Sequence, residues 1–204
     1  MTAEVVNAPP DSFATLLLAH GAGAGMEHDW MASMAEALAD RGLRVVRFEF
    51  PYMQARREGR RPGPDRMPKL IACYRAQVEA QRAPVFLAGK SMGGRVATML
   101  APDVDCAGVV VFGYPFHPPG NPEKLRTAHL AGMQTPTLIV QGERDTFGHR
   151  GDVAAYKLST AVQFHWLADG DHSLKPRKKS GHTHAEHLDD AADAAAAFCR
   201  RQVG

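Results

Sequence analysis

Short runs of apolar, often β-branched residues recur along the chain and alternate with segments whose apolar residues return every three or four positions. Six of these runs have the length and composition of strands. Several are apolar nearly throughout, which is typical of parallel strands that are covered on both faces. The runs are residues 13–19, 43–48, 85–88, 108–112, 137–140 and 162–167. The pattern therefore predicts a largely buried parallel sheet.

Four further segments carry apolar residues at helical spacing, and they cover residues 30–38, 70–78, 96–100 and about 184–201. Gly42 follows the first of them and is a typical helix-stop residue. Strands that alternate with helices at this spacing predict a doubly wound α/β fold, with a mostly parallel sheet of about six or seven strands. A chain of 204 residues fits one domain, which we expect to span residues 1–204.

The composition is that of an ordinary globular protein, with 45% apolar and 23% charged residues. The net charge of +2 does not indicate a nucleic-acid partner. No apolar run approaches the roughly 18 residues that span a bilayer, and the start of the chain lacks the pattern of a signal peptide. The three cysteines (Cys73, Cys106 and Cys199) are odd in number and widely spaced, which favours a reducing compartment. We expect a cytoplasmic protein without a membrane partner, and nothing in the pattern specifies an oligomeric state.

Two stretches stand apart from this pattern, and both are expected to be loops. Residues 54–68 are rich in arginine and proline, and residues 175–187 are basic and rich in histidine. One interpretation is that they are solvated surface loops. The other is that they lie beside the functional site and favour an acidic substrate or partner.

The segment AGKSMGG, residues 88–94, fits two motifs with different chemistry. A phosphate-binding P-loop would require glycine at position 84, where the chain has proline, and strand-like residues precede Gly89. The alternative is G-x-S-x-G, in which a sharp turn between a strand and a helix exposes a nucleophilic serine. The segment VFLAG, residues 85–89, supplies the strand, and the segment RVATML, residues 95–100, supplies the helix. The motif therefore predicts Ser91 as a nucleophile, with a helix-capping serine as the structural alternative.

A serine nucleophile of this type requires an acid and then a histidine later in the chain, each in a loop after a strand. The segment after run 137–140 places Asp145 in such a loop, and the segment after run 162–167 places His172 in the next. The imidazole would accept the serine proton and the carboxylate would orient the imidazole. Glu143 and Asp171 remain alternative acids, because element boundaries predicted from sequence shift by a few residues.

Acyl transfer also requires two backbone N–H groups that bind the oxyanion. The residue after the nucleophile, Met92, supplies one of them. The other comes from the glycine-rich loop after the first strand, residues 20–25, whose small residues allow a close backbone approach. We assign it to Ala22, with Gly21 and Gly23 as alternatives.

With these motifs placed, the chain resembles the α/β-hydrolase superfamily over almost its whole length. More narrowly, it is similar to a group of small, lid-less predicted hydrolases that are distantly similar to dienelactone hydrolases. The stretches that carry this narrower resemblance are FPYM at 50–53, GYPFHPPG at 113–120 and DHSLK at 171–175. The resemblance implies a triad of Ser91, Asp145 and His172. Dienelactone hydrolases have cysteine where this chain has serine, so their lactone substrate is not carried over.

Together these features predict a serine hydrolase that cleaves a carboxylic ester, or else a thioester or peptide bond, through an acyl-enzyme. We expect a small-molecule acyl substrate, no cofactor and no metal. The group also resembles the hydrolase-like domain in a subunit of a histone-acetyltransferase complex. A non-catalytic interaction module with a hydrolase fold is therefore the alternative.

The segment 113–136 separates two strand-like runs and is too short for an inserted lid domain. We therefore expect an open site, with Tyr114, Phe116 and His117 lining the substrate pocket. The alternative for Tyr114 and Phe116 is that they only pack the loop. Lys90, next to the nucleophile, is expected to pair with a nearby carboxylate.

Overall fold

The computed structural model describes residues 4–82 and 84–204. Its centre is one sheet of seven strands in the order β1-β3-β2-β4-β5-β6-β7, in which β1 pairs antiparallel with β3 and all other pairs are parallel. The strands are β1 (Glu4–Asn7), β2 (Ala14–Ala19), β3 (Leu43–Phe48), β4 (Val85–Lys90), β5 (Gly108–Phe112), β6 (Thr137–Gly142) and β7 (Val162–Leu167). The predicted fold class is confirmed. Residues 1–3 and 83, which the predicted domain 1–204 also includes, lie outside the described residues.

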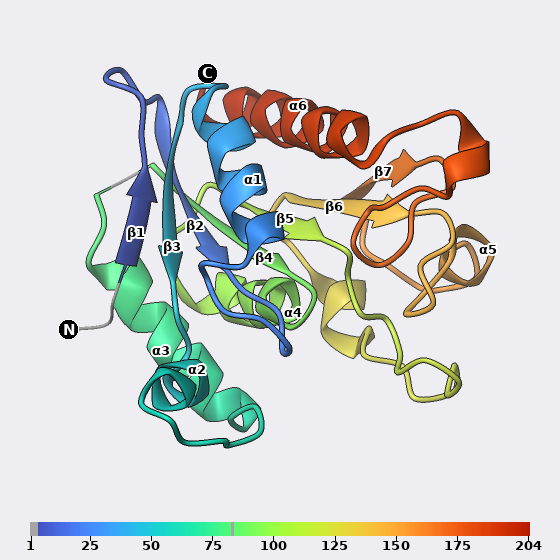
Figure 1. The fold of residues 1–204 in the computed structure, drawn as a ribbon, viewed down its shortest axis with the longest axis horizontal. Helices are drawn as coiled ribbons and strands as arrows, with labels where there is room; N and C mark the ends of the chain where they lie inside the picture. Colours follow the sequence, from blue (N-terminus) through green and yellow to red (C-terminus); the bar gives the residue numbers. More distant parts are fainter. Residues whose placement is uncertain (1–3, 83) are drawn as a thin grey trace.

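Helices cover both faces of this sheet (Figure 1). They are α1 (Asp29–Ala39), α2 (Pro51–Arg57), α3 (Met67–Glu79), α4 (Met92–Leu100), α5 (Arg150–Val153) and α6 (His184–Val203), with short 3-10 turns η1 (Ala101–Asp103), η2 (Ala128–Gly132) and η3 (Lys178–Ser180). Helices α1 and α6 lie on one face, and α3 and α4 lie on the other. None of the helices in the described part of the chain is both long and apolar enough to cross a bilayer.

The central strands are buried because each contributes side chains to two separate cores. In β2, Leu16 and Leu18 pack under α1 and α6, whereas Leu17 and Ala19 pack toward α3 and α4. Successive residues of a strand point to opposite faces, so an uninterrupted apolar run can fill both cores. This explains why the runs in the sequence do not alternate with polar residues.

Three local features differ from the sequence-based expectation. Strand β1 has no counterpart among the predicted runs, because its four residues lie half-exposed at the sheet edge and form no apolar run. The expected loop 54–68 is partly helical, because α2 continues to Arg57 and α3 begins at Met67. Likewise, the end of the expected loop 175–187 belongs to α6. That helix begins with a capping box in which Thr183 and Glu186 bond each other's backbone N–H groups.

The parallel strands place their carboxyl ends along one edge of the sheet, where loops converge. Three of the loops at this edge follow β4, β6 and β7 and carry the predicted nucleophile, acid and histidine. The connection 113–136, all of which the structure describes, contains loops and η2 and no lid domain. The edge therefore stays open above Ser91.

Candidate active site

Ser91 lies in a tight turn between β4 and α4 and has an unusual backbone conformation, with φ 52° and ψ −115°. Such a conformation costs a residue other than glycine about 1–3 kcal/mol. The neighbouring glycines are required by close backbone packing. A Cβ atom on Gly89 would lie 2.3 Å from the Gly93 carbonyl carbon, and one on Gly93 would lie 2.5 Å from the Ala19 oxygen. The turn holds the serine at the sheet edge and leaves it no role as a side-chain helix cap.

The structure brings Ser91, His172 and Asp145 together in one chain of hydrogen bonds. His172 Nε2 lies 2.8 Å from Ser91 Oγ, and His172 Nδ1 lies 2.7 Å from Asp145 Oδ2. A carboxylate can only accept, so the neutral imidazole donates from Nδ1 and its Nε2 is free to accept the serine proton. The Asp145 carboxylate is completely buried, whereas His172 is partly exposed. This is the arrangement in which a histidine can act as a general base.

The two alternative acids lie elsewhere and have other partners. Glu143 pairs with Arg150 at 2.8 Å. Asp171 accepts hydrogen bonds from the backbone N–H groups of Ser173 and Lys175, and it thereby caps its own turn. Neither carboxylate contacts the His172 ring by a hydrogen bond in the described structure.

Two residues that the sequence did not single out, Gln141 and Phe147, hold Asp145 and His172 in place. Gln141, at the end of β6, donates from Nε2 to Asp145 Oδ2 at 2.8 Å, and the Phe147 backbone N–H donates to Asp145 Oδ1 at 2.8 Å. The Phe147 ring stacks on the His172 ring, with their centroids 4.1 Å apart. The one sequence signal for Gln141 is a polar residue at the end of an otherwise apolar strand.

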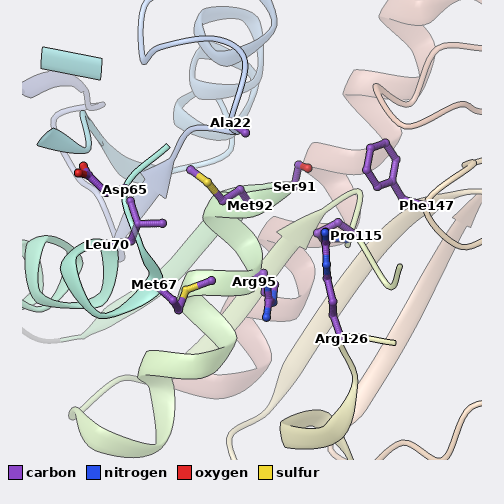
Figure 2. A pocket seen from close by; sticks show the side chains of 10 residues that line it. All are labelled: Ala22, Asp65, Met67, Leu70, Ser91, Met92, Arg95, Pro115, Arg126 and Phe147. Atoms are coloured by element: carbon purple, nitrogen blue, oxygen red, sulfur yellow. The ribbon is translucent and has the colours of Figure 1, made fainter. Parts of the chain in front are cut away.

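The two residues assigned to the oxyanion site, Ala22 and Met92, line the same hollow as Ser91 (Figure 2). Met92 is the first residue of α4, where a backbone N–H has no partner within the helix. The loop that carries Ala22 is fixed by Tyr52, whose Oη lies 3.1 Å from the Gly21 oxygen and 3.0 Å from the Ala22 oxygen. A fixed loop is what a preorganised oxyanion site requires.

Comparisons with known proteins agree with this architecture. A family model described as an alpha/beta hydrolase domain matches residues 12–200. The chain belongs to the α/β-hydrolase family. Solved structures share its fold at low identity, among them the esterase domain of a Rhodothermus marinus protein, with 18% identity, a TM-score of 0.72 and 100% of each chain covered.

Two further solved structures resemble this hydrolase. An alpha-beta serine hydrolase homologue from Coxiella burnetii has 21% identity and a TM-score of 0.69, with 97% of this chain and 90% of that chain covered. An α/β serine hydrolase without a lid from Xanthomonas campestris has 19% identity and a TM-score of 0.66, with 97% of this chain and 88% of that chain covered. At these identities the likeness shows the fold.

Ser91 of the hydrolase lies between two open hollows. The larger has a volume of about 470 Å³ and the smaller about 330 Å³. The larger is lined by Ala22, Asp65, Met67, Leu70, Ser91, Met92, Arg95, Pro115, Arg126 and Phe147. The smaller includes Lys90, His172 and the glycine-rich loop 21–24. A substrate bound across Ser91 would therefore place its two ends in different surroundings.

The structure does not place Tyr114, Phe116 and His117 on the wall of either hollow that borders Ser91. All three are buried. Tyr114 Oη donates to the Arg126 oxygen at 2.8 Å, and the Arg126 backbone N–H donates to the Phe116 oxygen at 2.8 Å. The side chains of Tyr114 and Phe116 thus pack inward and support the backbone of Arg126. Within the loop 114–117, Pro115 is the residue that lines the larger hollow.

Lys90 of the hydrolase has a carbonyl partner where a carboxylate was expected. Its Nζ donates to the His172 oxygen at 3.0 Å and lies 5.0 Å from the centroid of the Trp30 ring. Burial lowers the pKa of Lys90 to about 8, although the charges of Asp145 and Asp171 oppose this shift. Lys90 therefore connects the strand that leads to Ser91 with the loop that carries His172.

Replacement of Lys90 with methionine is expected to stabilise the hydrolase near neutral pH, by roughly 1–3 kcal/mol, and to lose this advantage as pH rises. Because the pKa of Lys90 is lowered on folding, the unfolded chain binds more protons between about pH 8 and the ordinary pKa of 10.5. The stability of the wild type therefore rises through this range relative to that of the variant. Urea unfolding of both proteins from about pH 7 to about pH 10 measures the difference. A difference that does not depend on pH would contradict the prediction.

Proposed function

We propose that this α/β-hydrolase cleaves carboxylic esters through a covalent acyl-enzyme, with Ser91 as nucleophile, His172 as general base and acid, and Asp145 as the group that orients His172. The observation that carries the proposal is the unbroken hydrogen-bond chain from Ser91 Oγ through the His172 ring to the buried Asp145 carboxylate. The tight turn at Ser91 supports the same role, because it exposes the hydroxyl at the sheet edge.

The reaction begins when Ser91 Oγ attacks the ester carbonyl carbon and its proton passes to His172 Nε2. The carbonyl oxygen becomes an oxyanion, and the backbone N–H groups of Met92 and Ala22 bind it. The tetrahedral intermediate then expels the alkoxide, which takes the proton from His172 and leaves as an alcohol. Water repeats the sequence on the acyl-enzyme and releases the acid and free Ser91.

Two observations support a small carboxylic ester as the substrate. Both hollows beside Ser91 are open and of modest volume, which suits a small acyl compound. The esterase domain from Rhodothermus marinus shares the fold over the full length of both chains. Parallel assays with short-chain p-nitrophenyl esters and the corresponding thioesters would rank the two classes of substrate.

Labelling with a fluorophosphonate probe tests the proposal directly. An activated serine displaces fluoride and forms a stable phosphonyl ester, so the wild type should be labelled and Ser91→Ala should not. Ser12→Ala, at a distant turn, is the matched control and should label like the wild type. A folded wild type that does not react would favour the non-catalytic interaction module. Labelling that persists in Ser91→Ala would refute the assignment of the nucleophile.

A further inference from the structure

Two arginines face the larger hollow beside Ser91. Arg95 lies on α4, one helical turn after Ser91 and therefore about 6 Å along the helix axis. Arg126 comes from the connection between β5 and β6, just before η2. Figure 2 shows both side chains below Ser91, with Pro115 above Arg126. The two cations reach the same space from different parts of the chain.

Neither arginine has an acidic partner in the part of the chain that the structure describes. Within residues 4–82 and 84–204, no carboxylate forms an ion pair with Arg95 or Arg126. Asp65 is the acidic residue among those that line the hollow, and its carboxylate bonds to Lys69 and to the Tyr52 backbone N–H. In addition, Arg95 Nε is buried without a hydrogen-bond partner in the described structure.

This pair of like charges is unfavourable in the free protein. Burial lowers the pKa of Arg126, and the charge of Arg95 lowers it further. The pKa of His129 is lowered by burial and then by Arg95. Arg95 also lies in the first turns of α4, where the helix dipole disfavours a positive charge. Packing alone does not explain why Arg95 and Arg126 lie close together without a carboxylate partner. A bound anion would neutralise both positive charges.

Arg126 is held in position by buried groups. Its backbone oxygen accepts a hydrogen bond from Tyr114 Oη at 2.8 Å, and its backbone N–H donates to the Phe116 oxygen at 2.8 Å. Tyr114 and Phe116 are both fully buried. A fixed backbone limits the conformational entropy that the arginine loses when it binds a ligand.

The position of His172 indicates which part of a substrate meets the arginines. The leaving oxygen must take a proton from His172 Nε2, so it must lie within hydrogen-bond reach of that atom. His172 lines the smaller hollow and not the larger one. A leaving group that takes this proton would therefore lie in the smaller hollow, and the acyl chain would extend into the larger hollow toward Arg95 and Arg126.

We propose that Arg95 and Arg126 bind a carboxylate at the far end of the acyl chain, so that the substrates are half-esters of short dicarboxylic acids. Guanidinium groups match the geometry of a carboxylate and bond it with two parallel N–H groups. This assignment rests on the proposed ester hydrolysis. It names the class of acyl group that the same site accepts.

A pair of substrates that differ in one charge tests the assignment. The anionic probe is the mono-p-nitrophenyl ester of glutaric acid, and the neutral probe is its methyl ester, which has the same acyl chain. The wild type should have a kcat/KM for the anionic probe at least about 10-fold above that for the neutral probe. Arg95→Gln and Arg126→Gln should each lower kcat/KM for the anionic probe by about 10- to 100-fold, as expected for loss of a charge-assisted hydrogen bond.

The neutral probe reports whether each variant is folded and active, and its kcat/KM should change by less than about 3-fold. Arg201→Gln, an exposed arginine at the end of α6, removes the same charge away from the site and should behave like the wild type. Equal rates for the two probes, or an anionic preference that survives both substitutions, would overturn the arginine assignment and leave ester hydrolysis standing. Turnover of neither probe, together with no fluorophosphonate labelling, would overturn both proposals.

Discussion

Replacement of His172 with alanine is expected to lower kcat for ester hydrolysis by roughly a million-fold, because residues of a triad act as a unit and loss of the base costs nearly as much as loss of all three. His172 Nε2 is the group 2.8 Å from Ser91 Oγ, and without it the hydroxyl keeps its proton at neutral pH. Asp145→Asn should lower kcat by roughly 10,000-fold, since an amide favours the wrong imidazole tautomer.

Hydrolysis of p-nitrophenyl acetate, corrected for the uncatalysed rate, measures both variants. His165→Ala is the control, because His165 pairs with Asp190 near the protein surface, away from Ser91, and its loss should leave kcat unchanged. Thermal unfolding shows whether each variant is folded. A folded His172→Ala protein that keeps more than about a tenth of the wild-type kcat would rule out His172 as the base.

Replacement of Gly89 with alanine is expected to destabilise the protein by more than about 3 kcal/mol, which is the upper end of the range for overpacking. The added Cβ would lie 2.3 Å from the Gly93 carbonyl carbon and 2.4 Å from the Gly94 nitrogen. Both atoms belong to the backbone at the start of α4, so they cannot yield by a change of rotamer. Relief requires that α4 move away from β4, which would also displace Ser91.

Urea unfolding compares this variant with Gly63→Ala. A Cβ on Gly63 meets no atom within 4 Å, and its φ is not in the left-handed region, so this control should change stability by less than about 1 kcal/mol. A Gly89→Ala protein as stable as the control would show that the turn at Ser91 can accept a side chain.

The sheet could be predicted from the sequence because its signal is local. The boundaries of β3, β5 and β7 agree with the predicted runs, since each is a short segment rich in β-branched or aromatic residues. Strand β1 has no such signal, because its position depends on pairing with β3 at an exposed edge. That Ser91, Asp145 and His172 lie close together could also be predicted, because each follows a strand and the carboxyl ends of parallel strands converge at one edge of the sheet.

The walls of the site could not be predicted in this way. Tyr114 and Phe116 follow β5 and look like pocket residues in the sequence, yet they pack inward because the connection folds back and uses them to fill the core. Arg95 and Arg126 do not stand out in the sequence, because nothing local distinguishes an arginine at a site from one on a surface. The proposal that they bind a carboxylate depends on the absence of acidic partners in the described fold. Only the tertiary arrangement reveals that absence.

The hydrogen bond from Lys90 to the His172 oxygen bears on the catalytic cycle. Ser91 and His172 lie 81 positions apart in the chain, and under the proposed mechanism the hydrogen bond between their side chains would break and form again in every turnover. The bond from Lys90 involves only the His172 backbone, so it persists while the proton moves. In the proposed mechanism, the segments that carry Ser91 and His172 would thus stay connected by a contact that does not involve the reacting atoms, and the His172 loop would keep its position in the acyl-enzyme.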